Sequence, residues 1–183
     1  MGVTSRIDGT TADFDEGQRV SRLLSSPDRE RLLPGVTDTE LKILAGLAAG
    51  RTYAEIAGRL GFRPKTVKNK GLVLLKKISP RRRRIEAVSR LVELAHPNVS
   101  TAELERVQQV LSDAVLSGRE LRLLELMATG HSTNEVALAL GLRGKSVKNH
   151  VSNIVQKLEV PNRTVAAVLW LLAAGPSEDC FEK

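Results

Sequence analysis

The amino-acid sequence predicts an all-α fold made of two tandem four-helix units joined by a connecting helix. Three observations support this prediction. No segment shows the sustained alternation of apolar and polar residues that a half-buried strand requires. Residues 36–95 align without a gap with residues 116–175 when the chain is shifted by 80 positions, and 19 of the 60 aligned pairs are identical. Sequences of the form Ser/Thr-x-x-Glu, typical of a helix capping box, recur at matching places in both copies.

Composition limits the classes of function. The chain has 183 residues, a formal net charge of +7, and only 3% aromatic residues. A basic surface suits a polyanionic partner such as nucleic acid. The single cysteine, Cys180, excludes a disulfide framework and favours a reducing, cytoplasmic location. The N-terminal segment lacks an apolar leader, and the most apolar run, residues 165–174, is too short to cross a bilayer, so no membrane contact is expected.

Each element follows from local signals, which are clearest in the second copy. There the first helix opens at Ser117 and stops at Gly130, the second runs from Ser132 to Gly141, the third from about Lys145 to Leu158, and the fourth, after a break at Pro161, from about Arg163 to Ala174. The first copy repeats the pattern: Thr37 to Gly50, Thr52 to Gly61, a third helix from Pro64, a break at Pro80, and a fourth helix to Ala95.

Two short helices joined by a glycine-containing turn, inside a unit of four, are the helix-turn-helix arrangement. We therefore expect a divergent helix-turn-helix domain at residues 36–95 and a second such domain at residues 116–175. Ser100 and Glu103 open a connecting helix within residues 96–115. Residues 1–35 are expected to be a tail with a short helix around 19–33, and residues 176–183 a second tail.

The third helix of the second copy divides into two faces. Val147, Val151, Ile154 and Leu158 follow one another at helical spacing and form the expected buried stripe. The other face carries short polar side chains, and asparagine and glutamine are suited to pairing with adenine edges. Its members are Asn149, Ser152, Asn153 and Gln156, with Lys145 and Lys148 in the first turn.

The first copy keeps Asn69 but has Leu72, Val73 and Lys76 at the positions of the other three polar residues. An exposed Leu-Val pair would contact thymine methyl groups or another protein. The charge also differs: residues 36–95 hold 14 Lys+Arg and 5 Asp+Glu, a net +9, whereas residues 116–175 hold 7 and 4, a net +3. We expect the arginine run of residues 81–84 to contact DNA phosphates, which add affinity but little sequence information.

Residues 116–175 resemble the LuxR/NarL-type four-helix DNA-binding domain. The resemblance rests on Arg119-Glu120, Ala128-x-Gly130, Ser132-x-x-Glu135-Val136-Ala137, Leu140, Ser146-Val147-Lys148-x-His150, Ile154, Lys157-Leu158 and Arg163. It implies a transcription regulator whose third helix enters the major groove and whose fourth helix mediates dimerisation. Residues 36–95 resemble the family more weakly, with Lys70 where the histidine is expected. Both copies depart from the family in having arginine, Arg63 or Arg143, where a serine or threonine usually caps the third helix. Residues 1–35 are also too few for the receiver or ligand-sensing domain usual in the family.

Geometry and resemblance together give the candidate residues. The expected base contacts are Lys145, Lys148, Asn149, Ser152 and Asn153, with Lys65, Lys68 and Asn69 in the first copy. The expected phosphate contacts are Ser132, Arg143, Ser146, Lys157 and Arg163, with Arg63, Thr66, Arg81, Arg82, Arg83 and Arg84 in the first copy.

The two fourth helices differ in polarity. Residues 85–94 are amphipathic, whereas residues 165–174 are apolar all round, with Leu169 and Trp170 where the first copy has Ser89 and Arg90. Leu169, Trp170 and Ala173 therefore need a second protein surface. We expect a symmetric homodimer through this helix; the alternative is contact with another part of the same chain.

The favoured function is a sequence-specific DNA-binding transcriptional regulator, with double-stranded DNA as partner and RNA polymerase or another regulator as a further one. Two alternatives remain open: an interaction protein of the transcription machinery whose first copy docks on a protein, and an architectural DNA-binding protein associated with recombination. No catalytic set, cofactor motif or metal-ligand cluster is found in the sequence, so neither an enzyme nor a metal or cofactor site is expected.

Overall fold

The computed structural model describes residues 25–79, 83–95 and 99–174. Across these ranges the chain forms helices and no strand. The helices are α2 (Arg29–Leu32), α3 (Asp38–Ala48), α4 (Tyr53–Leu60), α5 (Pro64–Ile78), α6 (Arg84–Ala95), α7 (Thr101–Asp113), α8 (Gly118–Ala128), α9 (Thr133–Ala139), α10 (Gly144–Lys157) and α11 (Arg163–Ala174). The prediction of an all-α fold is confirmed.

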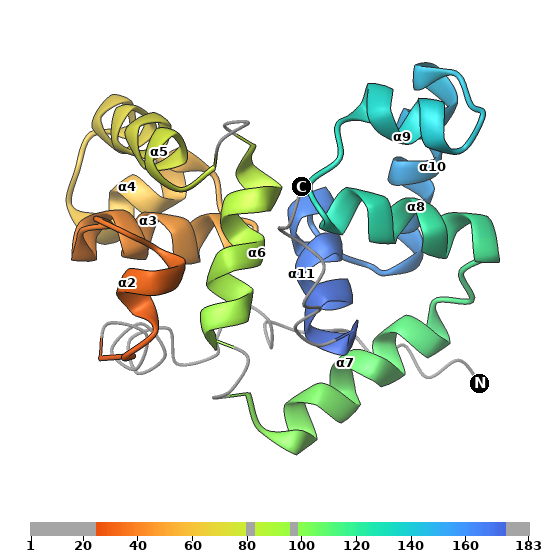
Figure 1. The fold of residues 1–183 in the computed structure, drawn as a ribbon, viewed down its shortest axis with the longest axis horizontal. Helices are drawn as coiled ribbons and strands as arrows, with labels where there is room; N and C mark the ends of the chain where they lie inside the picture. Colours follow the sequence, from red (N-terminus) through yellow and green to blue (C-terminus); the bar gives the residue numbers. More distant parts are fainter. Residues whose placement is uncertain (1–24, 80–82, 96–98, 175–183) are drawn as a thin grey trace.

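The same order of helices occurs twice. The bounds of α3 and α8 differ by the same 80 residues that align the two copies, and α4, α5 and α6 correspond to α9, α10 and α11 within a residue or two. We refer to residues 36–95 as the first repeat and to residues 116–175 as the second repeat. Figure 1 shows the helices of the first repeat on the left and those of the second on the right, with α6 and α11 between them.

Capping boxes begin the helices where the sequence predicted them. Thr37, Thr52, Ser100, Ser117 and Ser132 each accept a hydrogen bond from the backbone N–H three residues later, and the glutamate at that position accepts one in return. Two of these boxes open α4 and α9, the second helix of each repeat. The third helices begin differently, because the arginines at their N-caps make no side-chain capping bond.

In each repeat a buried glutamate lies in the first turn of the first helix. The Glu120 side chain is 7% exposed and accepts a hydrogen bond of 2.8 Å from the Lys157 ammonium. Glu40 and Lys77 form the same pair at 2.8 Å. The hydrogen bond from Lys157, followed by that from the Ser117 backbone, lowers the pKa of Glu120 to about 2. Burial raises the pKa of Glu40, but the hydrogen bonds from Lys77 and Thr37 outweigh it and lower the pKa overall.

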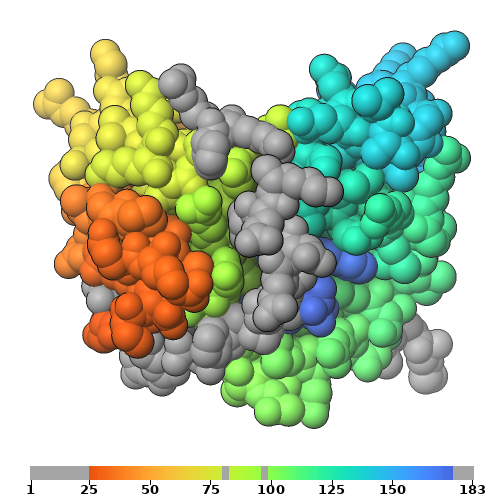
Figure 2. All heavy atoms as spheres, viewed as in Figure 1, coloured from red at the N-terminus to blue at the C-terminus, as the bar shows by residue number. Residues whose placement is uncertain are grey.

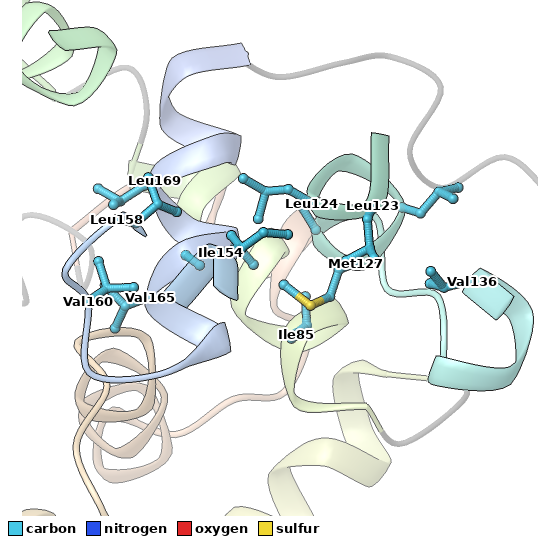
Figure 3. Packing of buried hydrophobic residues seen from close by; sticks show 14 of the residues in the cluster. Ile85, Leu123, Leu124, Met127, Val136, Ile154, Leu158, Val160, Val165 and Leu169 are labelled. Atoms are coloured by element: carbon cyan, nitrogen blue, oxygen red, sulfur yellow. The ribbon is translucent and has the colours of Figure 1, made fainter. Parts of the chain in front are cut away.

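The two repeats pack against each other through their fourth helices, and α11 also packs against α8, α7 and α3. Ile85 of α6 belongs to the core of the second repeat, and Figure 3 shows it beside Met127 of α8. In the other direction Val168, Leu171 and Leu172 of α11 pack against the core of the first repeat. The apolar surface of α11 therefore has partners within the chain.

Leu169 and Trp170, two of the residues predicted to form a homodimer surface, pack within the chain, and the homodimer itself stays a prediction. Leu169 is only 4% exposed, and Trp170 packs half-buried against the same cluster; Ala173 is also half-buried. For Leu169 the alternative partner, another part of the same chain, is the one that the structure shows. The physical reason is that α6, α7 and α8 surround α11 and leave little of its apolar face for a second copy.

The described segments outside the repeats contain one short helix each, joined to the repeats by turns. The connecting helix α7 packs against α11, and Val107, Val110 and Leu111 cover the core of the second repeat. The expected N-terminal helix is present only as α2, which packs against α6. The rest of that prediction, and the tail at residues 176–183, lie outside the described residues.

Candidate nucleic-acid interface

Helix α10 presents the two faces that its sequence predicts. Val147, Ile154 and Leu158 are buried, and Val151 is half-buried against the same cluster. The polar residues of the opposite face are all exposed: Lys145, Lys148, Asn149, Ser152, Asn153 and Gln156. The Ser152 hydroxyl donates a hydrogen bond of 3.2 Å to the Lys148 carbonyl, so its oxygen remains an acceptor for a partner. This face offers amide and hydroxyl groups of the kind that pair with base edges.

The turn before α10 leaves the start of the helix at the surface. Gly141 has a φ of +61°, a conformation that glycine adopts without strain, and it follows the C-terminal end of α9. Arg143, at the N-cap, is exposed, and Ser132 and Ser146 are half-buried. Ser132 is held by its capping role, because it accepts from the Glu135 N–H at 3.3 Å. Arg143 is therefore the most accessible of the expected phosphate contacts near this turn.

Lys157, another expected phosphate contact, is already engaged. Its ammonium contacts Glu120 at 2.8 Å and the Val115 carbonyl at 3.4 Å. Lys77 makes the equivalent contacts with Glu40 and the Gly35 carbonyl, at 2.8 and 3.1 Å. This structural role was not predicted from the sequence, although identical Lys and Glu residues at matching places in both repeats were a signal that could have revealed it.

Helix α5 presents a different face on the same scaffold. Lys65, Lys68 and Asn69 are exposed and Thr66 is half-buried. Leu72 and Val73 are 49% and 48% exposed, and nearby Phe62 lies 6.0 Å from the Lys70 ammonium.

Residue 71 is a glycine, where the second repeat has Val151, because the Tyr53 side chain leaves little room for a Cβ. A Cβ at Gly71 would lie 3.0 Å from the Tyr53 ring and 3.2 Å from its hydroxyl oxygen. The tyrosine therefore fills the space that the valine side chain takes in the second repeat, where Thr133 stands at the position of Tyr53.

Arg83 and Arg84, the described residues of the run at 81–84, make different contacts. Arg83 is 26% exposed, and its guanidinium donates to the Gly130 carbonyl at 2.6 Å and to the Glu135 carboxylate at 2.7 and 3.2 Å. Arg83 is thus engaged with the second repeat, and its predicted contact with phosphate stays a prediction. Arg84 is exposed and lies 5.4 Å from the Tyr53 ring. Arg63 and Arg163 are exposed, and Arg81 and Arg82 lie outside the described residues.

Glu135 combines two functions in the fold. Its carboxylate accepts from the Ser132 N–H at 2.6 Å as part of the cap of α9, and it binds Arg83 of the other repeat. The hydrogen bond from Arg83, followed by that from Ser132, lowers the pKa of Glu135 to about 2. The start of the helix-turn-helix in the second repeat is thus tied to the first repeat. No local pattern in the sequence predicted this contact.

The described part of the chain contains no group of three or more His, Cys, Asp or Glu residues arranged to hold a metal ion. None of the helices described combines the length and the hydropathy needed to span a bilayer.

Residues 114–170 match the family of bacterial regulatory proteins of the luxR type. The transcriptional regulatory protein DegU of Brevibacillus brevis is 48% identical over 54 residues, which cover 30% of this chain and 23% of DegU. The response regulator protein VraR of Staphylococcus aureus, and that of Staphylococcus epidermidis, are also 48% identical over 54 residues, covering 26% of each. The chain thus spans about a quarter of the length of these curated relatives. No solved structure matches the chain significantly. Residues 114–170, which contain α8, α9, α10 and most of α11, are therefore a helix-turn-helix domain of the luxR family.

Proposed function

We propose that this protein is a sequence-specific DNA-binding transcriptional regulator and that α10 enters the major groove. The observation that carries the proposal is the exposed polar face of α10, within a domain of the luxR family. Asn149, Ser152 and Asn153 offer donors and acceptors to base edges, while Lys145 and Lys148 stand in the first turn of the helix. The major groove is wide enough for an α-helix and presents a distinct pattern for each base pair.

Phosphate contacts position this helix. Arg143 and Arg163 are exposed at the two ends of the segment that contains α10. Their charges suit contact with the backbone on either side of the groove, and such contacts supply affinity that falls as salt concentration rises. Lys157 contributes less directly, since its pair with Glu120 holds the end of α10 against the start of α8.

The first repeat adds phosphate contacts in this proposal. It carries most of the positive charge, and Arg63, Lys65 and Lys68 are exposed around the start of α5. Leu72 and Val73 stand where the second repeat has the Ser152 hydroxyl and the Asn153 amide that would contact bases. We therefore assign base recognition to the second repeat and electrostatic affinity to the first, as two tandem helix-turn-helix domains with different tasks. The homodimer through α11 that the sequence predicts is not tested by the packing of one chain, and a single-chain binding unit is the rival to it.

A matched pair of variants tests the assignment. Asn149→Ala and Asn69→Ala remove the same side chain from the same helical position in the two repeats. We expect Asn149→Ala to reduce the preference for a selected duplex over a scrambled one by about 1–3 kcal/mol. We expect Asn69→Ala to change that preference much less. Equal effects of the two variants, or no effect of Asn149→Ala, would contradict the proposal; the measurement is a fluorescence-anisotropy titration at fixed salt.

A second candidate function is favoured by the exposed Leu72 and Val73. In this alternative α5 docks on another protein, as in an interaction protein of the transcription machinery or an architectural protein that assembles DNA for recombination. Leu72→Ser combined with Val73→Ser separates the candidates. Unchanged DNA affinity together with loss of a defined protein partner, such as RNA polymerase holoenzyme, would favour the alternative.

A further inference from the structure

Reciprocal hydrogen bonds link the two repeats. The Asn162 amide donates to the Gly50 carbonyl at 2.9 Å, and Arg83 donates to the Gly130 carbonyl at 2.6 Å. Gly50 and Gly130 are equivalent positions, each just after the first helix of its repeat. Asn162 and Arg83 both lie between the third and fourth helices of the opposite repeat. Each repeat therefore binds the other in nearly the same way, as two halves related by an approximate two-fold axis do.

Close packing accompanies these hydrogen bonds. A Cβ at Gly50 would lie 2.6 Å from Val165 Cγ2, 3.0 Å from the Asn162 amide nitrogen and 3.1 Å from Pro161. A Cβ at Gly130 would lie 3.4 Å from that of Glu86. Both glycines also have positive φ angles, +80° and +87°. A side chain at Gly50 would clash with Val165 and push the repeats apart, whereas at Gly130 the positive φ rather than lack of space favours glycine.

The interface is asymmetric in its polar groups. Arg83 also binds Glu135 with both of its terminal nitrogens, at the cap of α9. The Ser89 hydroxyl donates 2.9 Å to the Ala128 carbonyl at the end of α8, whereas the position equivalent to Ser89 is Leu169. These unlike contacts favour pairing of the first repeat with the second over pairing of either repeat with a copy of itself.

The arrangement leaves both third helices available at one edge of the molecule. In Figure 1, α5 lies at the upper left and α9 and α10 at the upper right, with α6 and α11 between them. In Figure 2 the yellow segment around α5 and the light-blue segment around the start of α10 project from the same upper edge. The exposed lysines at the starts of both helices suit a polyanion that extends along this edge.

We propose that a single chain is the complete DNA-binding unit and that it contacts two neighbouring segments of one duplex. Helix α10 contacts bases in one segment, and α5, through Lys65, Lys68 and Arg63, contacts phosphates in the other. The preferred site is asymmetric, with one specified half and a flank of variable sequence. The inference rests on the proposed function, because it presupposes that α10 binds DNA.

Stoichiometry and duplex length provide the first test. The full chain selects a duplex of about 30 base pairs, roughly three helical turns, from a random pool. We expect native mass spectrometry to show one chain per duplex. We also expect that shortening the duplex on the flank contacted by α5 weakens binding about tenfold or more. The slope of log Kd against log salt should then fall by about 3, because the phosphate contacts of Arg63, Lys65 and Lys68 are lost. Two chains per duplex, or the same affinity for long and short duplexes, would overturn the inference.

Charge variants identify the repeat that contacts the flank. Lys65→Gln combined with Lys68→Gln should weaken binding to the long duplex and leave binding to the shortened duplex nearly unchanged. Asn149→Ala should reduce sequence preference on both duplexes. If Asn149→Ala has no effect on either duplex, the proposed function fails and the inference fails with it. If Asn149→Ala acts as expected but the lysine variant weakens both duplexes equally, only the inference fails.

Interface variants test whether the repeats must be held together. Gly50→Ala forces a side chain into the contact with Val165, whereas Gly35→Ala has a similar positive φ, +64°, and open space around it. Gly50→Ala should lose most of the long-duplex advantage, and the matched control Gly35→Ala should keep it. Circular dichroism checks that both variants remain helical. If Gly50→Ala does not fold, Arg83→Lys replaces it, since lysine keeps the charge but cannot reach Gly130 and Glu135 with the same two-pronged geometry. Retention of the full long-duplex advantage in the variant used would overturn the inference.

Discussion

Helices α5 and α10 share a scaffold but expose different chemistry. Both begin after an arginine N-cap, both bury an equivalent valine, Val67 or Val147, and both end with a lysine that pairs with a buried glutamate. Their outward faces differ because Leu72 and Val73 stand where α10 has Ser152 and Asn153. The residues shared by the two repeats therefore build the same helical scaffold, while the residues that differ give α5 and α10 different exposed chemistry.

The largest effect is expected from the shared core. Ile154 and Leu74 are equivalent and fully buried. We expect Ile154→Ala and Leu74→Ala each to lower the free energy of unfolding by about 2–5 kcal/mol, through lost apolar burial and the cavity left behind. Chemical denaturation followed by circular dichroism measures the change. Since the repeats pack against each other, we expect a single transition in both variants, and a resolved second transition would show that they unfold independently.

The next effect comes from the buried ion pairs. Lys157→Met and Lys77→Met remove the ammonium and leave Glu120 or Glu40 buried without its partner. We expect a loss of about 1–3 kcal/mol in each case, because the buried carboxylate loses its positively charged partner and keeps only the hydrogen bonds of the N-cap residue. Thermal denaturation at neutral pH measures it. Equal losses in the two repeats would support a purely structural role for Lys157, and an unchanged melting temperature would contradict it.

A smaller effect is expected from acidification. The pKa values of Glu120 and Glu135 are lowered to about 2, so these carboxylates contribute stability that is fully present above their ordinary range near 4.5. That stability is lost as pH falls from about 4.5 towards 2, because the carboxylates bind protons at a higher pH in the unfolded state than in the folded state. Partial exposure of Glu135 weakens its share through solvent screening. Melting temperatures between pH 6 and pH 2 should fall, and Glu135→Gln should reduce the fall. An identical pH profile in that variant would contradict the linkage.

The smallest effect on stability is expected from exchanging the outward face of α5 for that of α10, a change that should instead alter DNA specificity. Replacing Leu72, Val73 and Lys76 by Ser, Asn and Gln gives α5 the outward face of α10. Because these positions are exposed, the free energy of unfolding should change by no more than about 0.5 kcal/mol. Selection from a random duplex pool should then recover bases specified in the flank as well. Continued variability of that flank would show that the outward face alone does not determine base recognition.

Local sequence patterns predicted much of the fold. The capping boxes at Thr37, Thr52, Ser100, Ser117 and Ser132 begin helices where expected, because a cap depends on residues three positions apart. The exposed face of α10 was predictable for the same reason, since helical spacing alone separates it from the buried stripe. The roles of Arg83 and Lys157 were not predictable in this way, because each depends on a partner distant in the chain.

By itself the sequence determined the helices, the repeat, and the polar and apolar faces of α5 and α10, since these depend on interactions within a few residues. Only the tertiary structure decided that α11 packs on α6 of the same chain, that Arg83 binds Glu135 at the cap of α9, and that Tyr53 fills the space above Gly71. The physical reason is that local sequence shows which apolar or charged side chains need a partner, whereas the partner they meet depends on how the whole chain packs.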